Sequence, residues 1–120
     1  MAESLFSSPR TFQVWLYTVG HSTLLLRSVK KPGLETRIDV IFKPVRCMNL
    51  STVLDGIDIL RIPAAALEGK MKGAIAPDEE VFSLCGARAE SWVVSGVVAW
   101  HEDQGEYDDP SHFSVPMVVL

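Results

Sequence analysis

The densest group of reactive side chains lies between residues 101 and 112, in the stretch HEDQGEYDDPSH. It contains five carboxylates flanked by His101 and His112. Carboxylates can ligate hard cations, and carboxylates or histidines can act as general acids and bases. The spacing matches neither an EF-hand loop nor the His-Glu-x-x-His zinc motif, so we predict no metal site. We expect a solvated acidic loop, with an enzyme that uses residues 101–112 as an alternative.

A second candidate for chemistry is His21, which lies in the Gly20-His21-Ser22 break between two apolar runs. A histidine at such a turn can act as a general base or contact a ligand. Neighbouring residues in a tight turn rarely point together, and no carboxylate lies close in sequence to orient the imidazole. We therefore expect His21 to bind a ligand and predict no catalytic residue, with catalysis by His21 as an alternative.

Arg37 and the tryptophans supply further groups for a ligand site. Arg37 and Asp39 share one face of a predicted strand, where they could form a ligand clamp or a cross-strand ion pair. Trp92 and Trp100 also share a strand face and could line a pocket for a planar ligand, the alternative being core and interface packing. The predicted ligand-binding set is therefore Arg37, Trp92, Trp100 and His21.

The overall composition excludes several kinds of partner. The 120 residues are 48% hydrophobic and 22% charged, which is ordinary for one folded domain. The net charge of −4 argues against nucleic-acid binding, which needs a basic surface. No apolar run has the length of a membrane-spanning helix, and the N-terminus lacks the pattern of a signal peptide. We expect a cytoplasmic protein with Cys47 and Cys85 reduced, without a cofactor and without a membrane partner.

Apolar and polar residues alternate between glycine and proline breaks, a pattern that predicts short β-strands. The predicted strands cover residues 11–19, 23–30, 35–43, 57–62, 81–85 and 92–101. Residues 1–10 are a predicted loose lead-in, residues 45–56 are irregular, and residues 64–68 form a short helical turn. We therefore predict a single β-rich domain over residues 1–120. Its fold is mainly β, an antiparallel six- to seven-stranded barrel or two-layer sandwich with one or two short helical turns.

Two residues interrupt predicted strands. Pro44 has no backbone N–H to donate to a β-ladder, so we predict that it marks the end of the strand over residues 35–43 or an edge position. Gly96 lies in the middle of the strand over residues 92–101. A glycine at such a position often marks a β-bulge or the close approach of another backbone.

The first predicted strand, residues 11–19, carries large apolar side chains on both faces. On simple alternation, Phe12 and Leu16 share one face, and Trp15 and Tyr17 share the other. A strand with one face in water would have polar residues on that face. We therefore expect both faces to be covered, either by another part of the chain or by a second copy of the protein.

The apolar stretch FSVPMVVL, residues 113–120, also needs a cover in the fold or on a partner. Together with the first strand, it predicts a non-enzymatic binding or assembly module that self-associates, most simply as a homodimer. The partner can equally be another protein or a small molecule. A small-ligand-binding β-barrel with an aromatic-lined pocket is the alternative.

Overall fold

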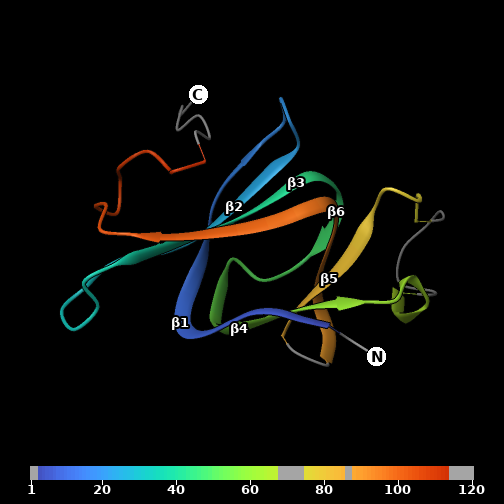
Figure 1. Ribbon diagram of the computed structural model, residues 1–120, viewed down its shortest axis with the longest axis horizontal. Coiled ribbons are helices and arrows are strands. Elements are labelled where there is room, and N and C mark those ends of the chain that lie inside the picture. Colours follow the sequence, from blue (N-terminus) through green and yellow to red (C-terminus); the bar gives the residue numbers. More distant parts are fainter. Residues whose placement is uncertain (1–2, 68–74, 86–87, 114–120) are drawn as a thin grey trace.

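Strand pairing closes the chain into a barrel (Figure 1). The computed structural model describes residues 3–67, 75–85 and 88–113, and within them six antiparallel strands form the ring β1-β2-β3-β6-β5-β4. The strands are β1 (Glu3–Thr18), β2 (Thr23–Ser28), β3 (Arg37–Asn49), β4 (Val53–Ile62), β5 (Glu80–Cys85) and β6 (Arg88–Asp103). A 3-10 turn, η1, spans Ala64–Leu67. The predicted mainly β, antiparallel fold with a short helical turn is confirmed.

β1 begins inside the segment that the sequence predicts as a loose lead-in, residues 1–10. It passes through Pro9 because the β1–β4 register shifts between Ser8 and Thr11. A β-bulge is a place where a strand tolerates proline, since no ladder donor is needed there. The Ser8 hydroxyl accepts a hydrogen bond from the backbone N–H of Arg10 at 3.2 Å. The serines and proline that predict a break in the chain therefore form a bulge in a continuous strand.

β3 likewise continues through Pro44, so the predicted strand end is wrong. The cause lies on β6, where an added Cβ at Gly96 would lie 3.0 Å from the Cδ atom of Pro44. The absent side chain leaves room for the proline ring and for the backbone carbonyl oxygen of Lys43, which would lie 3.3 Å from the added Cβ. This confirms the close approach of another backbone that is predicted at Gly96. Residues 45–56, predicted to be irregular, complete β3 and begin β4.

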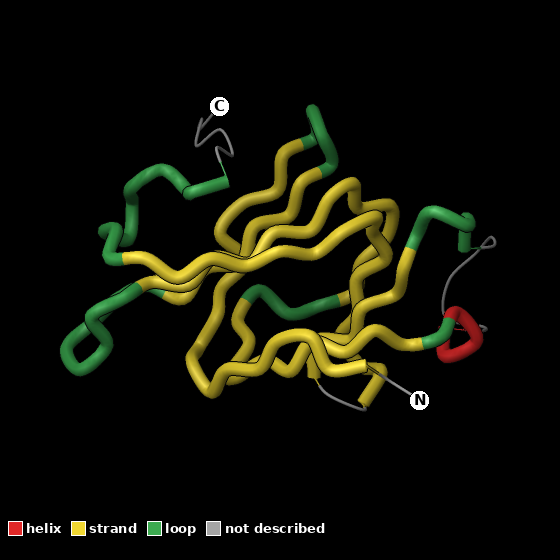
Figure 2. Tube along the Cα trace, in the orientation of Figure 1, coloured by secondary structure: helices red, strands yellow, loops and turns green. Residues whose placement is uncertain are grey.

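A second bulge changes the faces of β1. Val14 pairs with Leu26 of β2, but after a register shift Leu16 pairs with Leu25. Cross-strand partners share a face, so Leu16 leaves the inner face occupied by Phe12, and the simple alternation is wrong beyond the bulge. Figure 2 shows the resulting bent strands and the loops that connect them.

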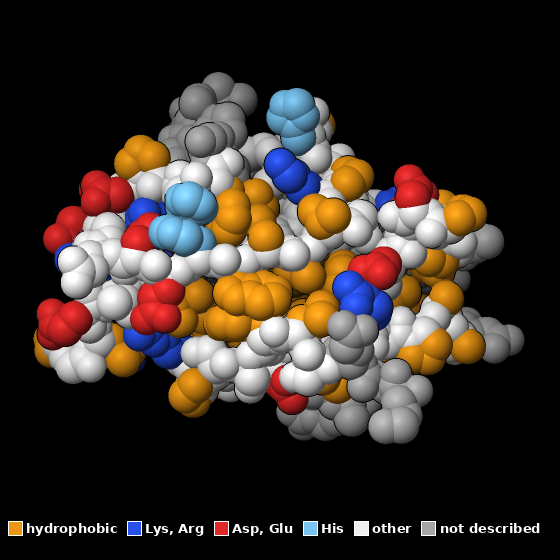
Figure 3. Space-filling view, in the orientation of Figure 1, with side chains coloured by type: hydrophobic (Ala, Val, Ile, Leu, Met, Phe, Trp, Pro, Cys, Tyr) orange, Lys and Arg blue, Asp and Glu red, His pale blue; other side chains and the backbone are white. Residues whose placement is uncertain are grey.

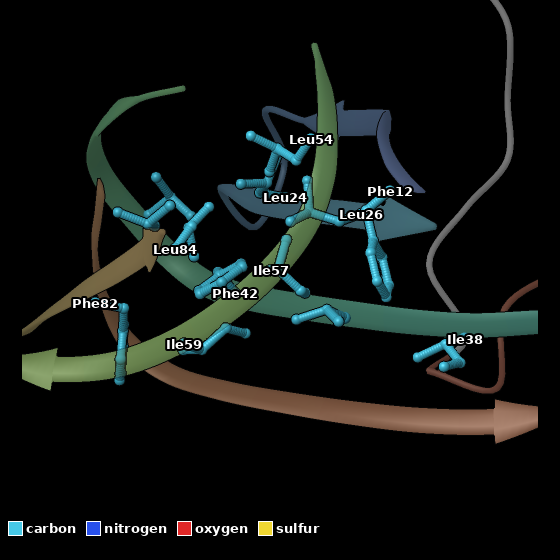
Figure 4. Packing of buried hydrophobic residues seen from close by; sticks show 13 residues of the cluster. Phe12, Leu24, Leu26, Ile38, Phe42, Leu54, Ile57, Ile59, Phe82 and Leu84 are labelled. Atoms are coloured by element: carbon cyan, nitrogen blue, oxygen red, sulfur yellow. The ribbon is translucent and has the colours of Figure 1, made fainter. Parts of the chain in front are cut away.

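The interior of the barrel is a packed hydrophobic core (Figure 4). Phe12, Leu24, Phe42, Ile59 and Phe82 come from β1 to β5 in turn, and all are completely buried. The rings of Phe42 and Phe82 lie 5.9 Å apart between centroids. Small barrels are commonly filled by side chains in this way. A ligand therefore has to use the wall or the outer surface of this barrel.

A smaller cluster covers part of the outer face of β5 and β6. Trp92 and Val94 of β6 pack there with Val81 of β5 and with Leu67 of η1. Their strand neighbours Val93 and Phe82 belong to the interior, so these side chains point outward. In the part of the chain that the structure describes, no helix has the length and apolar character needed to cross a membrane.

Candidate functional site

The residues predicted to bind a ligand lie in different parts of the molecule. Trp92 is buried in the outer cluster, and Arg37 is buried on the outer face of β3. Trp100 lies in the barrel wall, and His21 lies in the turn between β1 and β2. The structure therefore does not bring the predicted set together in a single pocket.

Arg37 is fully engaged by the chain that follows β6. Its guanidinium forms a two-pronged ion pair with Asp103, with 2.7 Å between Nε and Oδ1 and 3.2 Å between Nη2 and Oδ2. Its remaining N–H groups donate to the backbone carbonyls of Glu106, Asp109 and Pro110 at 2.7–3.0 Å. Arginine has five N–H donors, so none is left for a ligand. We call residues 104–113 the strap, because Arg37 ties this loop to the barrel.

Arg27 of β2 ties down the same strap. It is 0% exposed and forms a two-pronged ion pair with Asp39 of β3, at 2.7 Å and 3.0 Å. Its Nη1 group donates to the carbonyls of Tyr107 and Asp109 at 2.7 Å and 3.1 Å. The acidic loop is therefore not simply solvated: its carboxylates largely face water while its backbone is held by two buried arginines. Arg37 thus pairs with its ladder partner Asp103 on β6, and Asp39 pairs with its ladder partner Arg27 on β2. Both residues form cross-strand ion pairs rather than a ligand clamp, but on a buried face instead of a wet one.

The strap and Arg27 cover the Trp15 side chain. The guanidinium carbon of Arg27 lies 5.2 Å from the centroid of the Trp15 ring. The Tyr107 ring of the strap meets Trp15 edge to face, with centroids 6.5 Å apart. Cation–π and edge-to-face contacts of this kind are both attractive. Trp15, on the second face of the first strand, is thus covered by the same chain.

The far end of the strap rests on β6 through two histidines. The rings of His101 and His112 are stacked, with centroids 3.7 Å apart and planes 9° apart. The Nδ1 atom of His101 lies 3.4 Å from Oδ2 of Asp103. The two histidines that flank the carboxylates in sequence therefore pack together as part of the strap's attachment.

The ion pair between Asp103 and Arg37 makes the attachment of the strap sensitive to low pH. The hydrogen bond from Arg37, aided by the backbone N–H of Gly105, lowers the pKa of Asp103 from 3.8 to about 2 despite partial burial. A lowered pKa in the folded state means stability that is present above the unfolded pKa and is lost as the pH falls. We expect the free energy of unfolding to drop as the pH falls from about 3.8 to 2. Urea titrations should show a flatter pH profile for Asp103→Asn, whereas the exposed Asp108→Asn should keep the native slope.

Gly105 is needed where the strap crosses Arg37. An added Cβ at this position would lie 2.5 Å from the Cζ atom of Arg37. The guanidinium cannot move aside without losing Asp103 and the strap carbonyls. We expect Gly105→Ala to destabilise the protein by about 1–3 kcal/mol, the usual range for overpacking. Chemical denaturation checks this, with Gly20→Ala as the control because nothing lies within 4 Å of its added Cβ.

An aromatic pair forms part of the barrel wall, where strand pairing is incomplete. In the described ladders, β6 pairs with β5 only as far as Ser95, and β1 pairs with β2 only from Gln13 onward. Between these unpaired edges, the rings of Phe6 and Trp100 lie 5.2 Å apart and are tilted by 36°. Figure 3 shows apolar side chains gathered on the surface between β6 and the first half of β1. We call the Phe6–Trp100 pair the aromatic slot.

Trp100 is unusual because it lies on the inner face of β6 and still reaches water. Its partner on β3 is Val40, which is completely buried in the core. Trp100 nevertheless remains 41% exposed, whereas Phe12, which contacts Phe6 edge to face at 6.5 Å, is fully buried. The slot thus presents part of the Trp100 side chain to solvent in the barrel wall.

Polar groups lie beside the aromatic slot on β1 and β6. Glu102, two residues beyond Trp100, accepts a hydrogen bond from the hydroxyl of Thr36 at 2.5 Å. Arg10 donates to the carbonyl and the hydroxyl of Thr36 at 2.9 Å and 2.8 Å and lies 3.5 Å from Glu102. Phe6 and Arg10 belong to the predicted lead-in, so sequence reasoning missed them. The apolar Leu5-Phe6 pair ahead of the serines is the signal that could have found them.

The surface formed by the described residues includes two hollows. One, of about 460 Å³, lies at the start of β4 and includes Asp55, Asp58, Cys85 and Ser91. Asp55 accepts a hydrogen bond from the Thr11 hydroxyl at 3.0 Å. Across residues 3–67, 75–85 and 88–113, no group of three or more histidine, cysteine or acidic side chains is placed to hold a metal ion.

The other hollow, of about 500 Å³, is lined by His21, Lys43, Pro44 and Val97. None of these four described lining residues is a carboxylate. His21 is instead placed among an amine and apolar groups. Comparisons with protein-family models, with curated proteins and with solved structures found no match, so the functional argument rests on this geometry.

Proposed function

We propose that this protein is a binding module whose aromatic slot holds a flat, apolar group of a small-molecule ligand. The observation that carries the proposal is the exposure of Trp100, an inner-face tryptophan set against Phe6 in the barrel wall. A core residue in a closed barrel would be fully buried. Removal of the exposed indole surface from water by a planar ligand is favourable, and aromatic contact adds about 0.5–1.5 kcal/mol beyond the area term.

The surroundings of the slot support a ligand with a polar end. Ligand sites combine an apolar wall with a few polar groups that fix orientation. Arg10 and Glu102 provide both signs of charge beside the rings, and the Glu102 side chain is 54% exposed. A flat ring with one hydrogen-bonding nitrogen or oxygen fits this arrangement, because the ring can cover Trp100 while the polar atom reaches Glu102 or Arg10.

The test uses the indole N–H signals of the three tryptophans in a ¹⁵N-labelled sample. Quinoline serves as the planar probe, and Trp-to-Phe variants assign each signal. We expect quinoline at millimolar concentration to shift the Trp100 signal. Trp92 is buried and Trp15 lies under the strap, so their signals should stay within experimental error. Equal shifts at Trp15 and Trp100, or no shift at Trp100, would contradict the proposal.

Self-association is a second candidate, and the hairpin end of β1 favours it. Val19 is 83% exposed and Tyr17 is 41% exposed at the tip that projects from the barrel in Figure 1. Apolar side chains exposed at such a tip can pack against a second copy of the protein. The face of the first strand at Trp15 no longer argues for a dimer, because the strap covers it. The other sequence argument, the apolar stretch 113–120, falls mostly outside the described residues.

Size-exclusion chromatography with light scattering tests this second candidate. We expect a dimer at micromolar concentration that dissociates in Val19→Asp, whereas Val53→Asp at another exposed site leaves the mass unchanged. A monomer at all accessible concentrations would remove the candidate. We further propose a cytoplasmic location, which agrees with Cys47 and Cys85 being free thiols.

A further inference from the structure

The hollow beneath the β1–β2 turn is built by tertiary contacts. The backbone N–H of Val45 donates to the carbonyl of Ser22 at 2.7 Å, which holds the turn against β3. Ser22 adopts a φ of 50°, a left-handed conformation that few residues other than glycine accept. Such backbone strain persists where the surroundings impose it, often next to ligand sites. We call the lining residues His21, Lys43, Pro44 and Val97 the turn pocket.

The chemistry of the turn pocket is that of an apolar hollow with basic groups. Val97 is 52% exposed and stands beside Lys43, its ladder partner on β3. Pro44 is also exposed and packs against Gly96 at its back. In the part of the chain that the structure describes, no ion pair or hydrogen bond engages the ammonium of Lys43. An uncompensated cation beside apolar surface attracts a group of opposite charge.

We infer that the turn pocket binds a small amphipathic anion, with its apolar body on Pro44 and Val97 and its acidic group at Lys43 and His21. A carboxylate, sulfonate or phosphate head accepts hydrogen bonds from the ammonium, and the imidazole supplies a further donor. The apolar body removes the exposed Val97 surface from water. A purely apolar ligand would leave Lys43 beside it unpaired, and a purely ionic one would leave Val97 exposed.

This site is separate from the aromatic slot. Lys43 and Val97 form a ladder pair adjacent to Phe42 and Val98, which face the interior. Neighbouring pairs along a ladder point to opposite faces, so the turn pocket lies on the outer face of the barrel wall. Trp100 lies on the inner face. The inference therefore goes beyond the proposed function, and either site can fail without the other.

The experiment compares two fluorescent probes that share one aromatic body. 1-Anilinonaphthalene-8-sulfonate carries an acidic group, and N-phenyl-1-naphthylamine does not. We expect the native protein to bind the sulfonate at least about three-fold more tightly in low salt. Lys43→Met should weaken sulfonate binding by about three- to five-fold, the scale of an exposed ion pair, and added salt should have the same effect. Binding of the neutral probe should be unchanged.

Matched variants assign the effect to the turn pocket. Val97→Asp should remove the salt-sensitive part of sulfonate binding that depends on Lys43, while Lys31→Met, at an exposed turn elsewhere, should leave that part at the native level. Circular dichroism confirms that each variant is folded, and Lys43→Arg, which keeps the charge, should bind within about two-fold of native. Equal affinity for the two probes, or native affinity in Lys43→Met, would overturn the inference. Sulfonate binding that falls as the protein concentration rises would also overturn it, since a second copy would then occupy the pocket.

Discussion

Replacing Arg27 with methionine is expected to lower the free energy of unfolding by about 3–5 kcal/mol, the range found when one partner of a buried ion pair is removed. The side chains of Arg27 and Asp39 are 0% and 2% exposed, so water cannot compensate the carboxylate that remains. The variant also frees the carbonyls of Tyr107 and Asp109 and removes the contact on Trp15. Urea denaturation monitored by tryptophan fluorescence measures the change.

Two controls separate the buried pair from a general loss of charge. Lys30→Met removes a cation whose partner Glu106 is largely exposed, and an exposed pair contributes only about 0.2–1 kcal/mol. Arg27→Met combined with Asp39→Leu removes both buried charges and should recover part of the lost stability. A loss for Arg27→Met no larger than that for Lys30→Met would show that the strap is not held as described.

Replacing Phe42 with alanine is the second large effect, with an expected destabilisation of about 3–5 kcal/mol. Phe42 is completely buried on β3, between Leu24 of β2 and Val98 of β6, and its ring contacts Phe82 across the core. Loss of the ring leaves a cavity that the closed barrel cannot collapse to fill. Thermal or urea unfolding gives the value.

The matched control for Phe42 lies one ladder pair away on the same strands. Val97→Ala removes an exposed apolar side chain on the outer face, so the expected change is below about 0.5 kcal/mol. If Phe42→Ala cost less than about 1 kcal/mol, the barrel interior would not be the packed core described above.

The two largest expected losses of stability arise in different parts of the molecule: one in the core inside the barrel, the other under the strap on its outer face. Phe42 belongs to the interior, where burial of apolar surface supplies the stability. Arg27 and Arg37 lie on the outer face of β2 and β3, where the strap covers them and its carbonyls satisfy them. Acid therefore acts on the strap through Asp103 and should leave the apolar interior largely unaffected. The aromatic slot and the turn pocket remain open parts of the same wall.

The sequence by itself determined that the fold is mainly β and antiparallel and located the central part of each strand, but it missed the first half of β1, the second half of β3 and the start of β4. Alternating residues such as Ile38, Val40 and Phe42 define which strand face is buried, and this information lies within a few neighbouring residues. Gly96 likewise predicted the close approach that the ring of Pro44 makes. Local signals were misleading at Pro9, where a bulge lets proline stay in a strand, and at Trp15, where a bulge reverses the alternation.

Only the tertiary structure decided which side chains meet. Arg27 and Asp109 lie 82 positions apart, and Arg37 and Asp103 lie 66 apart, so no local pattern links them. The acidic residues 101–112 look like a solvated loop because their sequence shows charged side chains but not which carbonyls the arginines hold. Phe6 and Trp100 meet only because the barrel closes. His21 shares a hollow with Lys43 and Val97 because Val45 holds the turn. Closure of a barrel brings distant strands together, and that is where the two proposed binding surfaces arise.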